Sequence, residues 1–280
     1  MTKGGDLKRE TSLGLEPTNE RMVPESSDSL TFWEHVYRYA FASCFVKGKR
    51  VLDIACGEGY GAAALQGAGA AQVIGVDISE VACLHARDKY KIDARPGTAE
   101  QIPLADSSTD VVVSFETIEH VDNPGRFLDE CLRVLIPGGL LIISTPNRGV
   151  YAYAGGVPNP YHRSEMTEGE FALALGSRFR NLCFYTQRPR SAAWWSVRAF
   201  VADESPWKRL RGFVRLRRLI QAVLAPEAIK DPADEQRVSV SNLILRVSRS
   251  PHEFLNPFAL RRRREWIREK PTYVIATGIH

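Results

Sequence analysis

The sequence of 280 residues contains no apolar run close to the about 18 residues that a membrane-spanning helix needs. Its first residues, MTKGGDLKRE, also lack the apolar stretch of a secretory signal peptide. Only five cysteines are present and none forms a C-x-x-C pair, which argues against a disulfide framework and against a structural zinc site. We therefore expect a cytoplasmic protein without a transmembrane segment.

Charge is nearly balanced, at a formal net charge of +4, but it is unevenly distributed. The stretch 207–218 has six basic residues and no acidic one, and residues 261–264 are all arginine. A solvated surface is the ordinary explanation of such a pattern, and an anionic partner or a membrane surface is the alternative. The charge pattern leaves a nucleic acid as a less favoured partner and gives no indication of the oligomeric state.

Between Lys49 and Asn147, short β-branched runs alternate with helical stretches. The runs RVLDIAC, QVIGVDIS, DVVVSFE and GGLLIISTPN are continuously apolar, as in strands that are covered on both faces. This alternation is typical of parallel sheets. The sequence thus predicts an α/β fold, namely a Rossmann-like doubly wound, mainly parallel seven-stranded sheet with helices on both faces and an inserted subdomain.

The remainder of the chain suggests four parts. We expect a mobile N-terminal segment at 1–28, an N-terminal cover helix at 29–48, a core formed by 49–188 with 271–280, and an insertion at 189–270 that covers the acceptor side. RNLCFYTQ and PTYVIATGI are predicted strands of the core, and Thr167 with Glu170 predicts a capping box. The insertion contains a basic amphipathic helix and the strand-like run NLILRVS.

The segment VLDIACGEGYGAA predicts a strand, a glycine turn and the start of a helix, where backbone N–H groups can approach a ligand. Through Gly57, Gly59 and Ala62 it satisfies the glycine pattern of dinucleotide-binding proteins, with Asp77 placed for ribose hydroxyls. Asp53 argues against a dinucleotide, because its carboxylate would repel a pyrophosphate and would pair with an ammonium group. A purely structural tight turn remains the alternative.

From about Lys49 to Asn147 the sequence resembles the class I S-adenosylmethionine (SAM) methyltransferases. The resemblance implies that the glycine turn surrounds the methionine part of SAM, that VDIS holds the ribose, that GTAEQIP lies beside the adenine, and that the fourth strand closes the site. The residues implied to bind the cofactor are Asp53, Ala55, Gly57, Gly59, Asp77, Ile78, Ala99, Glu100, Phe115 and Glu116. Thr98 departs from relatives that carry an acid before the Ala-Glu pair.

Outside this core, ERMVP, EHVYRYAFA, SFETIEHV, STPN and NPYHRSEMTEGEF are similar to segments of bacterial methyltransferases associated with cell-surface glycan assembly. That resemblance implies that His35, Arg38 and Tyr39 belong to an N-terminal cover over the cofactor. Arg38 is then the expected partner of the methionine carboxylate, and Tyr39 a further cofactor contact.

The segment FETIEH places two carboxylates and an imidazole directly after a buried strand. If a helix begins near Glu116, the i, i+3 and i+4 spacing puts Glu116, Glu119 and His120 on one face, at the ligand end of the sheet. These groups suit a divalent cation such as magnesium or manganese. Helix capping is the plain alternative.

The same E-x-x-E-H triplet resembles that of ubiquinone-pathway O-methyltransferases and of methyltransferases that modify the 3′ ends of small RNAs. These families imply a divalent metal held by Glu116, Glu119, His120 and, downstream of the T-P-N turn, His162. They also imply an acceptor with two vicinal oxygens. In the competing metal-free interpretation His162 is the general base and Glu165 orients it. The candidate catalytic residues are His162, Glu165 and His120.

Together these features predict a SAM-dependent O-methyltransferase acting on a hydroxyl of a sugar or glycan-linked metabolite. Three alternatives remain: a phenolic or other small-molecule acceptor, an RNA 3′ terminus, and a SAM-binding module without enzymatic activity. A small-molecule or glycan acceptor is the expected partner.

Overall fold

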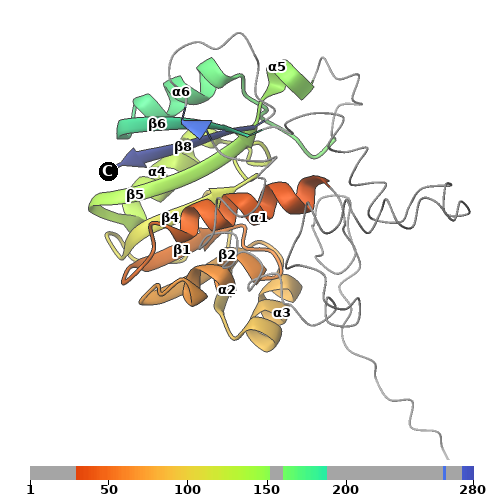
Figure 1. Ribbon diagram of the computed structural model, residues 1–280, viewed down its shortest axis with the longest axis vertical. Helices are drawn as coiled ribbons and strands as arrows, with labels where there is room; N and C mark the ends of the chain where they lie inside the picture. The colour runs from red at the N-terminus through yellow and green to blue at the C-terminus, as the bar shows by residue number, and fades with distance from the viewer. Residues whose placement is uncertain (1–29, 152–159, 188–260, 263–272) are drawn as a thin grey trace, which may run out of the picture.

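The computed structural model describes residues 30–151, 160–187, 261–262 and 273–280 (Figure 1). The expected N-terminal segment at 1–28 lies outside these residues. So do the predicted basic helix, the run NLILRVS and nearly all of the predicted insertion. In the part of the chain that the structure describes, no helix is long and apolar enough to cross a membrane.

The described chain forms a sheet with helices on both sides. Its strands are β1 Arg50–Ile54, β2 Gln72–Asp77, β3 Asp93–Pro96, β4 Thr109–Phe115, β5 Leu135–Pro146, β6 Arg180–Gln187, β7 Arg261–Arg262 and β8 Tyr273–Ile279. Its helices are α1 Leu30–Ser43, α2 Tyr60–Gly67, α3 Glu80–Tyr90, α4 Pro124–Val134, α5 Arg148–Tyr151 and α6 Glu168–Gly176.

The strand order is β3-β2-β1-β4-β5-β8-β6-β7. Strands β1 to β5 pair in parallel, and β8 is antiparallel to both of its neighbours, β5 and β6. Apart from β7, which has two residues, the sheet has seven strands and is mainly parallel, as predicted. The prediction of a Rossmann-like, doubly wound fold is therefore confirmed.

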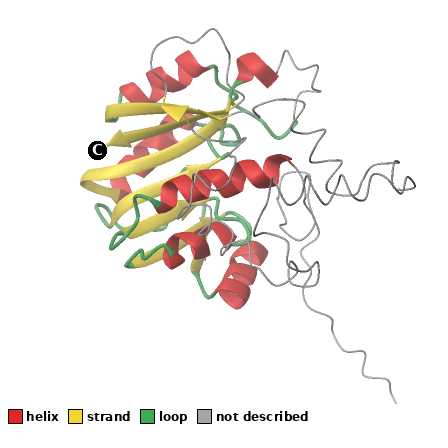
Figure 2. Ribbon diagram, in the orientation of Figure 1, coloured by secondary structure: helices red, strands yellow, loops and turns green. Residues whose placement is uncertain are grey.

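Successive side chains of the central strands point to opposite faces of the sheet. Val111 and Val113 of β4 join the core cluster formed with α1 and α2, whereas Val112 joins the cluster formed with α4 and α6. Figure 2 shows the sheet between these two helical layers. Because both faces are covered, the strands are apolar throughout, as the sequence predicts.

Local signals place the helix ends. Thr167 and Glu170 form the predicted capping box of α6. Ser79 caps α3, and Asn123 caps α4 ahead of Pro124. By contrast, the predicted strands omitted β3, whose sequence DARP has a single fully buried residue, Ala94, and therefore no hydrophobic pattern.

Candidate functional site

The site lies where the strand order reverses, between the carboxyl ends of β1 and β4. In doubly wound sheets such a reversal leaves a crevice in which ligands bind. The glycine turn follows β1, and the segment FETIEH begins at the end of β4. The two features that the sequence singled out are therefore neighbours in the structure.

Asp77, at the end of β2, braces the glycine turn. One of its carboxylate oxygens accepts a hydrogen bond from the Gly57 N–H at 2.8 Å, and the other accepts from the Ser79 N–H at 2.9 Å. The carboxylate therefore holds the turn to the start of α3. Each carboxylate oxygen can accept a second bond, so this role leaves capacity for ribose hydroxyls.

Gly57 and Gly59 both adopt left-handed conformations, with φ of +53° and +88°. A Cβ on Gly57 would meet nothing within 4 Å, so the backbone here is open to a ligand. A Cβ on Gly59 would lie 2.5 Å from the Cβ of Ala86, which means that this glycine is required for the packing of α3. Ala55 is exposed and also left-handed, at φ +56°. Strained backbone of this kind is concentrated at ligand sites.

Asp53 is fully buried, and the hydroxyl of Tyr39 lies 3.2 Å from each of its carboxylate oxygens. Burial raises the pKa of the Asp53 carboxyl to about 8; the Tyr39 hydrogen bond opposes that rise, and nearby Asp77 adds to it. A cation placed at this carboxylate would reverse the shift.

Tyr39 reaches Asp53 from α1, so the cover helix lies directly over the glycine turn. Its ring packs edge to face on Phe115 and Tyr60, with centroid distances of 5.0 and 5.8 Å. The hydroxyl of Tyr60 in turn lies 3.1 Å from Nδ1 of His35. A Cβ on Gly61 would lie 2.0 Å from the Tyr39 ring, so Gly61 provides the space that this ring fills.

Arg38 is fully buried beside Tyr39, and its guanidinium binds groups at the ends of three strands. It forms an ion pair of 2.7 Å with Glu116, and it donates hydrogen bonds to Ser144 and to Gln187. The Gln187 amide also donates to the Glu34 carbonyl. In the structure Arg38 thus ties α1 to the ends of β4, β5 and β6. The expected partner, a methionine carboxylate, would have to compete with Glu116.

The residues expected beside the ribose and adenine lie at the ends of β2 and β3. Ile78 is 80% exposed directly after Asp77, and Ala99 is partly buried against the core. Glu100 accepts a hydrogen bond from the Asn123 N–H at 2.8 Å, and its carbonyl accepts one from Arg126. Glu100 therefore fixes the start of α4 in addition to any ligand contact.

The predicted helix at FETIEH is wrong. Residues 116–120 form a turn, α4 begins only at Pro124, and Glu116 has a left-handed φ of +53°, which no right-handed helix contains. Its Oε1 accepts a hydrogen bond from Ser144 at 2.7 Å while it pairs with Arg38. These two contacts direct the Glu116 side chain toward α1.

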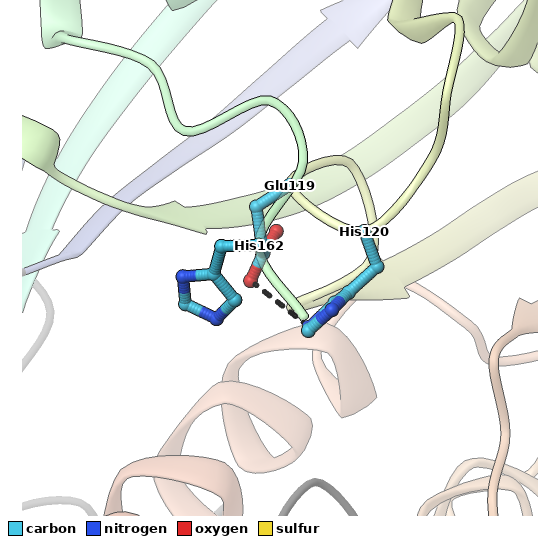
Figure 3. A group of neighbouring side chains, drawn as sticks. All are labelled: Glu119, His120 and His162. Carbon is cyan, nitrogen blue, oxygen red and sulfur yellow. Dashed lines mark ion pairs between the residues drawn. The ribbon is translucent and has the colours of Figure 1, made fainter. Parts of the chain in front are cut away.

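Glu119, His120 and His162 do come together (Figure 3). One ligand atom from each lies within 4.8 Å of the others, a spacing that can hold a metal ion. The Glu119 side chain is 1% exposed, and its Oε1 lies 3.9 Å from Nε2 of His120. The structure does not bring Glu116, the fourth expected ligand, into this group.

Each histidine of the group has a hydrogen-bond partner at Nδ1. Nδ1 of His120 lies 3.2 Å from the Tyr161 carbonyl oxygen, and Nδ1 of His162 lies 2.5 Å from Oε1 of Glu165. These are the expected partners of ligating or basic imidazoles. Glu165 therefore lies where the metal-free interpretation expects it, and its role in orienting His162 stays a prediction.

Burial raises the pKa of the Glu119 carboxyl well above its usual range, and the neighbouring Glu116 raises it further. Thr145 donates a hydrogen bond to Oε2 at 3.4 Å. Oε1 has no hydrogen-bond partner among the described residues. A buried carboxylate oxygen in this condition favours the binding of a proton or a cation.

The loop 160–166, which carries His162, is docked on the turn 117–121. The N–H groups of Arg163 and Ser164 both donate to the Glu119 carbonyl, at 2.8 and 3.0 Å. The Ser164 hydroxyl lies within 3.1 Å of the carbonyl oxygens of Ile118 and Val121, and Arg163 pairs with Asp122. These contacts hold the two histidines at one place.

The sequence analysis missed several residues of the site. Ser144 and Thr145 belong to the STPN segment, whose position at the end of a predicted strand was an available signal. Ser164 and Gln187 carry no local signal, because their partners lie 46 and 149 residues away in the chain.

Comparisons with known proteins agree on one family. Residues 52–143 match the model of the methyltransferase domain. A probable S-adenosylmethionine-dependent methyltransferase of Mycolicibacterium smegmatis is 38% identical over 177 residues, which are 61% of this chain and 67% of that protein. A ubiquinone biosynthesis O-methyltransferase of Maricaulis maris is 43% identical over 114 residues, which are 39% of this chain and 44% of that protein.

Among solved structures, that of a SAM-dependent methyltransferase of Thermotoga maritima, described as a possible histamine N-methyltransferase, superposes with a TM-score of 0.54. The match covers 88% of each chain at 18% identity. At that identity the likeness concerns the fold alone. This chain spans less than half the length of the ubiquinone O-methyltransferase it matches, so that protein's substrate is not carried over with the similarity.

Proposed function

The chain belongs to the SAM-dependent methyltransferases, and we propose that within this family it is an O-methyltransferase acting on a hydroxyl with a neighbouring second oxygen, as in a sugar or a glycan-linked metabolite. The observation that carries the proposal is the group formed by Glu119, His120 and His162 at the end of β4. The group follows β4, next to the glycine turn after β1, which we propose binds the methyl donor.

The donor side fits SAM. Asp53 offers a buried carboxylate that a single Tyr39 hydroxyl cannot fully satisfy, and Gly57 leaves its backbone open. We propose that Asp53 pairs with the ammonium group, that Ala55, Gly57 and Gly59 border the methionine, and that Phe115 and Tyr39 close the site. In the same proposal the ribose contacts are Asp77 and Ile78, and the adenine contacts are Ala99 and Glu100.

On the acceptor side, Glu119, His120 and His162 would hold a divalent cation. Such an ion, when bound, lowers the pKa of a coordinated hydroxyl and so makes it a better nucleophile. Tyr161 and Glu165 orient the imidazoles of His120 and His162, respectively, through hydrogen bonds at Nδ1. An acceptor with two vicinal oxygens would suit such an ion.

The dyad of His162 and Glu165 also supports a metal-free version of the same reaction. With Nδ1 held by Glu165 at 2.5 Å, Nε2 of His162 can take the proton of the acceptor hydroxyl. Exhaustive chelation separates the two versions. Activity that survives chelation supports the metal-free base, and activity that is lost and then restored by a divalent cation supports the metal.

A second candidate acceptor is a phenol with two adjacent oxygens. The similarity to the ubiquinone biosynthesis O-methyltransferase, which is 43% identical over 39% of this chain, favours it. A panel of sugar diols and catechols, incubated with methyl-labelled SAM and followed by mass spectrometry, tests both candidates. Label on a nitrogen, or on acceptors without a neighbouring oxygen, would contradict the proposal.

We further propose that the insertion 189–270, which lies almost wholly outside the described residues, covers the acceptor side. Gln187, the last residue of β6 before that segment, is hydrogen bonded to Arg38. The chain therefore leaves the core next to α1 and the ends of the central strands.

A further inference from the structure

We propose that the two glutamates of FETIEH have different roles: Glu119 is the carboxylate ligand of a three-residue site with His120 and His162 that prefers a zinc-like ion to magnesium, whereas Glu116 anchors the cover helix α1 through Arg38. The inference rests on the proposed metal-assisted function and concerns which residues bind the ion and which ion they prefer.

Glu116 is directed away from the group. Its Oε1 lies 2.7 Å from Arg38 Nη1 and accepts a hydrogen bond from the Ser144 hydroxyl, also at 2.7 Å. Arg38 is fully buried, so solvent screens its charge little. A cation bound to Glu116 would have to displace this guanidinium or accept its repulsion.

Glu119 is directed into the group. Its Oε1 is buried without a hydrogen-bond partner among the described residues, and Nε2 of His120 lies 3.9 Å away. That separation is too long for a hydrogen bond. It is shorter than the ~4.2 Å that two ligands can span when each is ~2.1 Å from one ion.

The histidine tautomers point to a cation. A carbonyl oxygen only accepts hydrogen bonds, so Nδ1 of His120, which faces the Tyr161 carbonyl, carries the ring proton. In the neutral ring, Nε2 then presents a lone pair to Glu119. His162 is held in the same way by the Glu165 carboxylate. The three ligand atoms lie within 4.8 Å of one another, so a pair at that limit must close by at least about 0.6 Å to come within the ~4.2 Å that one ion can span.

The donor set determines the class of ion. Two imidazole nitrogens and one carboxylate oxygen suit zinc and its neighbours. A His₂Glu set leaves one position of a four-coordinate ion open, and expansion to five ligands would admit the second oxygen of the acceptor. Magnesium prefers oxygen ligands in an octahedral arrangement and keeps several waters. Because Glu116 is paired with Arg38, the described group offers magnesium oxygen from only one side chain, Glu119.

Glu116 acts on the donor side. Through Arg38 it holds α1, and the next residue of that helix, Tyr39, lies over Asp53. Loss of the Glu116 charge would therefore disturb the position of α1 and weaken the binding of SAM, while the metal group keeps its three ligands.

The test is metal binding by the full chain, freed of any affinity tag and of metal. Zinc, magnesium and SAM are titrated calorimetrically, and cobalt(II) is titrated by visible absorption, in the unaltered protein and in Glu119→Gln, Glu116→Gln and His162→Asn. Glu116→Gln is the matched control, since it removes the same charge three residues away. Circular dichroism confirms that each variant is folded.

We expect one zinc site that binds at least about tenfold more tightly than magnesium. Glu119→Gln and His162→Asn should weaken zinc binding about tenfold or more and reduce the cobalt absorption. Glu116→Gln should leave zinc affinity within about threefold and should weaken SAM binding.

Three results would overturn the inference. If Glu116→Gln loses zinc as Glu119→Gln does, the division of roles is wrong although metal assistance stands. If magnesium binds as tightly as zinc, the assignment of the ion is wrong. If the unaltered protein binds no divalent ion and still transfers methyl groups, the metal-assisted function fails together with this inference.

Discussion

The hydroxyl of Tyr39, from the cover helix, lies 3.2 Å from both carboxylate oxygens of Asp53 at the end of β1. A hydroxyl has one proton, so it can satisfy only one of these oxygens at a time. The contact therefore leaves a buried carboxyl group incompletely satisfied, at the place where the proposed methyl donor carries its ammonium group.

This contact predicts a pH dependence. The pKa of Asp53 is raised to about 8, from an unfolded value near 4, so between these values the folded protein holds a proton that the unfolded chain lacks. Without ligand, stability should fall as pH rises through this range. SAM affinity should rise over the same range, because the ammonium pairs with the ionised form.

Calorimetric SAM titrations between pH 6 and 8, in buffers of different ionisation enthalpy, check this prediction. Binding should release protons in the unaltered protein, and Asp53→Asn should bind SAM weakly without that proton release. The same proton release in Asp53→Asn would assign it to another group.

Gly61→Ala should weaken SAM binding. A Cβ at this position would lie 2.0 Å from the Tyr39 ring, so the ring and α1 must move, at a cost of about 1–3 kcal/mol of stability. Gly169→Ala is the matched control, because it also lies in a helix and its Cβ would meet nothing within 4 Å. Thermal denaturation and SAM titration measure both variants, and equal behaviour of the two would contradict the prediction.

Asp77→Ala should lower both SAM affinity and stability. It removes the acceptor of two backbone N–H groups and, by the proposal, of the ribose hydroxyls, so SAM binding should weaken by about 1–3 kcal/mol. Asp77→Asn keeps one acceptor oxygen, so its SAM affinity and stability should lie between those of the unaltered protein and those of Asp77→Ala. Unchanged SAM affinity in Asp77→Ala would show that this carboxylate only braces the turn.

His162→Asn should reduce methyl transfer strongly and leave SAM affinity unchanged, because His162 belongs to the acceptor side. The unaltered protein should lose activity on exhaustive chelation and regain it with a divalent cation. Initial rates and SAM titrations measured on the same preparations check both statements. Full activity after chelation would leave His162 as a metal-free base, oriented by Glu165.

Ser164→Ala should lower the turnover number by loosening the loop that carries His162. The Ser164 hydroxyl bonds to the carbonyls of Ile118 and Val121, and one such hydrogen bond contributes about 1 kcal/mol. Ser164→Thr keeps the hydroxyl and should restore much of the rate. A change in SAM affinity without a change in turnover would contradict this positioning role.

The sequence by itself determined the glycine turn and the strands of the sheet other than β3 and β7. Runs such as DVVVSF are apolar throughout, so they predict strands covered on both faces, and helix ends follow from local groups such as Thr167 and Glu170. The glycine turn was also predictable, because Gly57 and Gly59 stand between an apolar strand run and a helical stretch, and both take the left-handed φ that glycine permits. These features depend on neighbours in the chain.

Only the tertiary structure decided how the carboxylates of FETIEH are used. The i, i+3, i+4 spacing predicted a helix, but Glu116 takes a left-handed conformation, held by Arg38 from α1 and Ser144 from β5. Likewise, His162 meets Glu119 because backbone hydrogen bonds dock the loop 160–166 on the turn after β4. Such contacts join residues tens of positions apart, and their energies depend on burial, which no local pattern specifies.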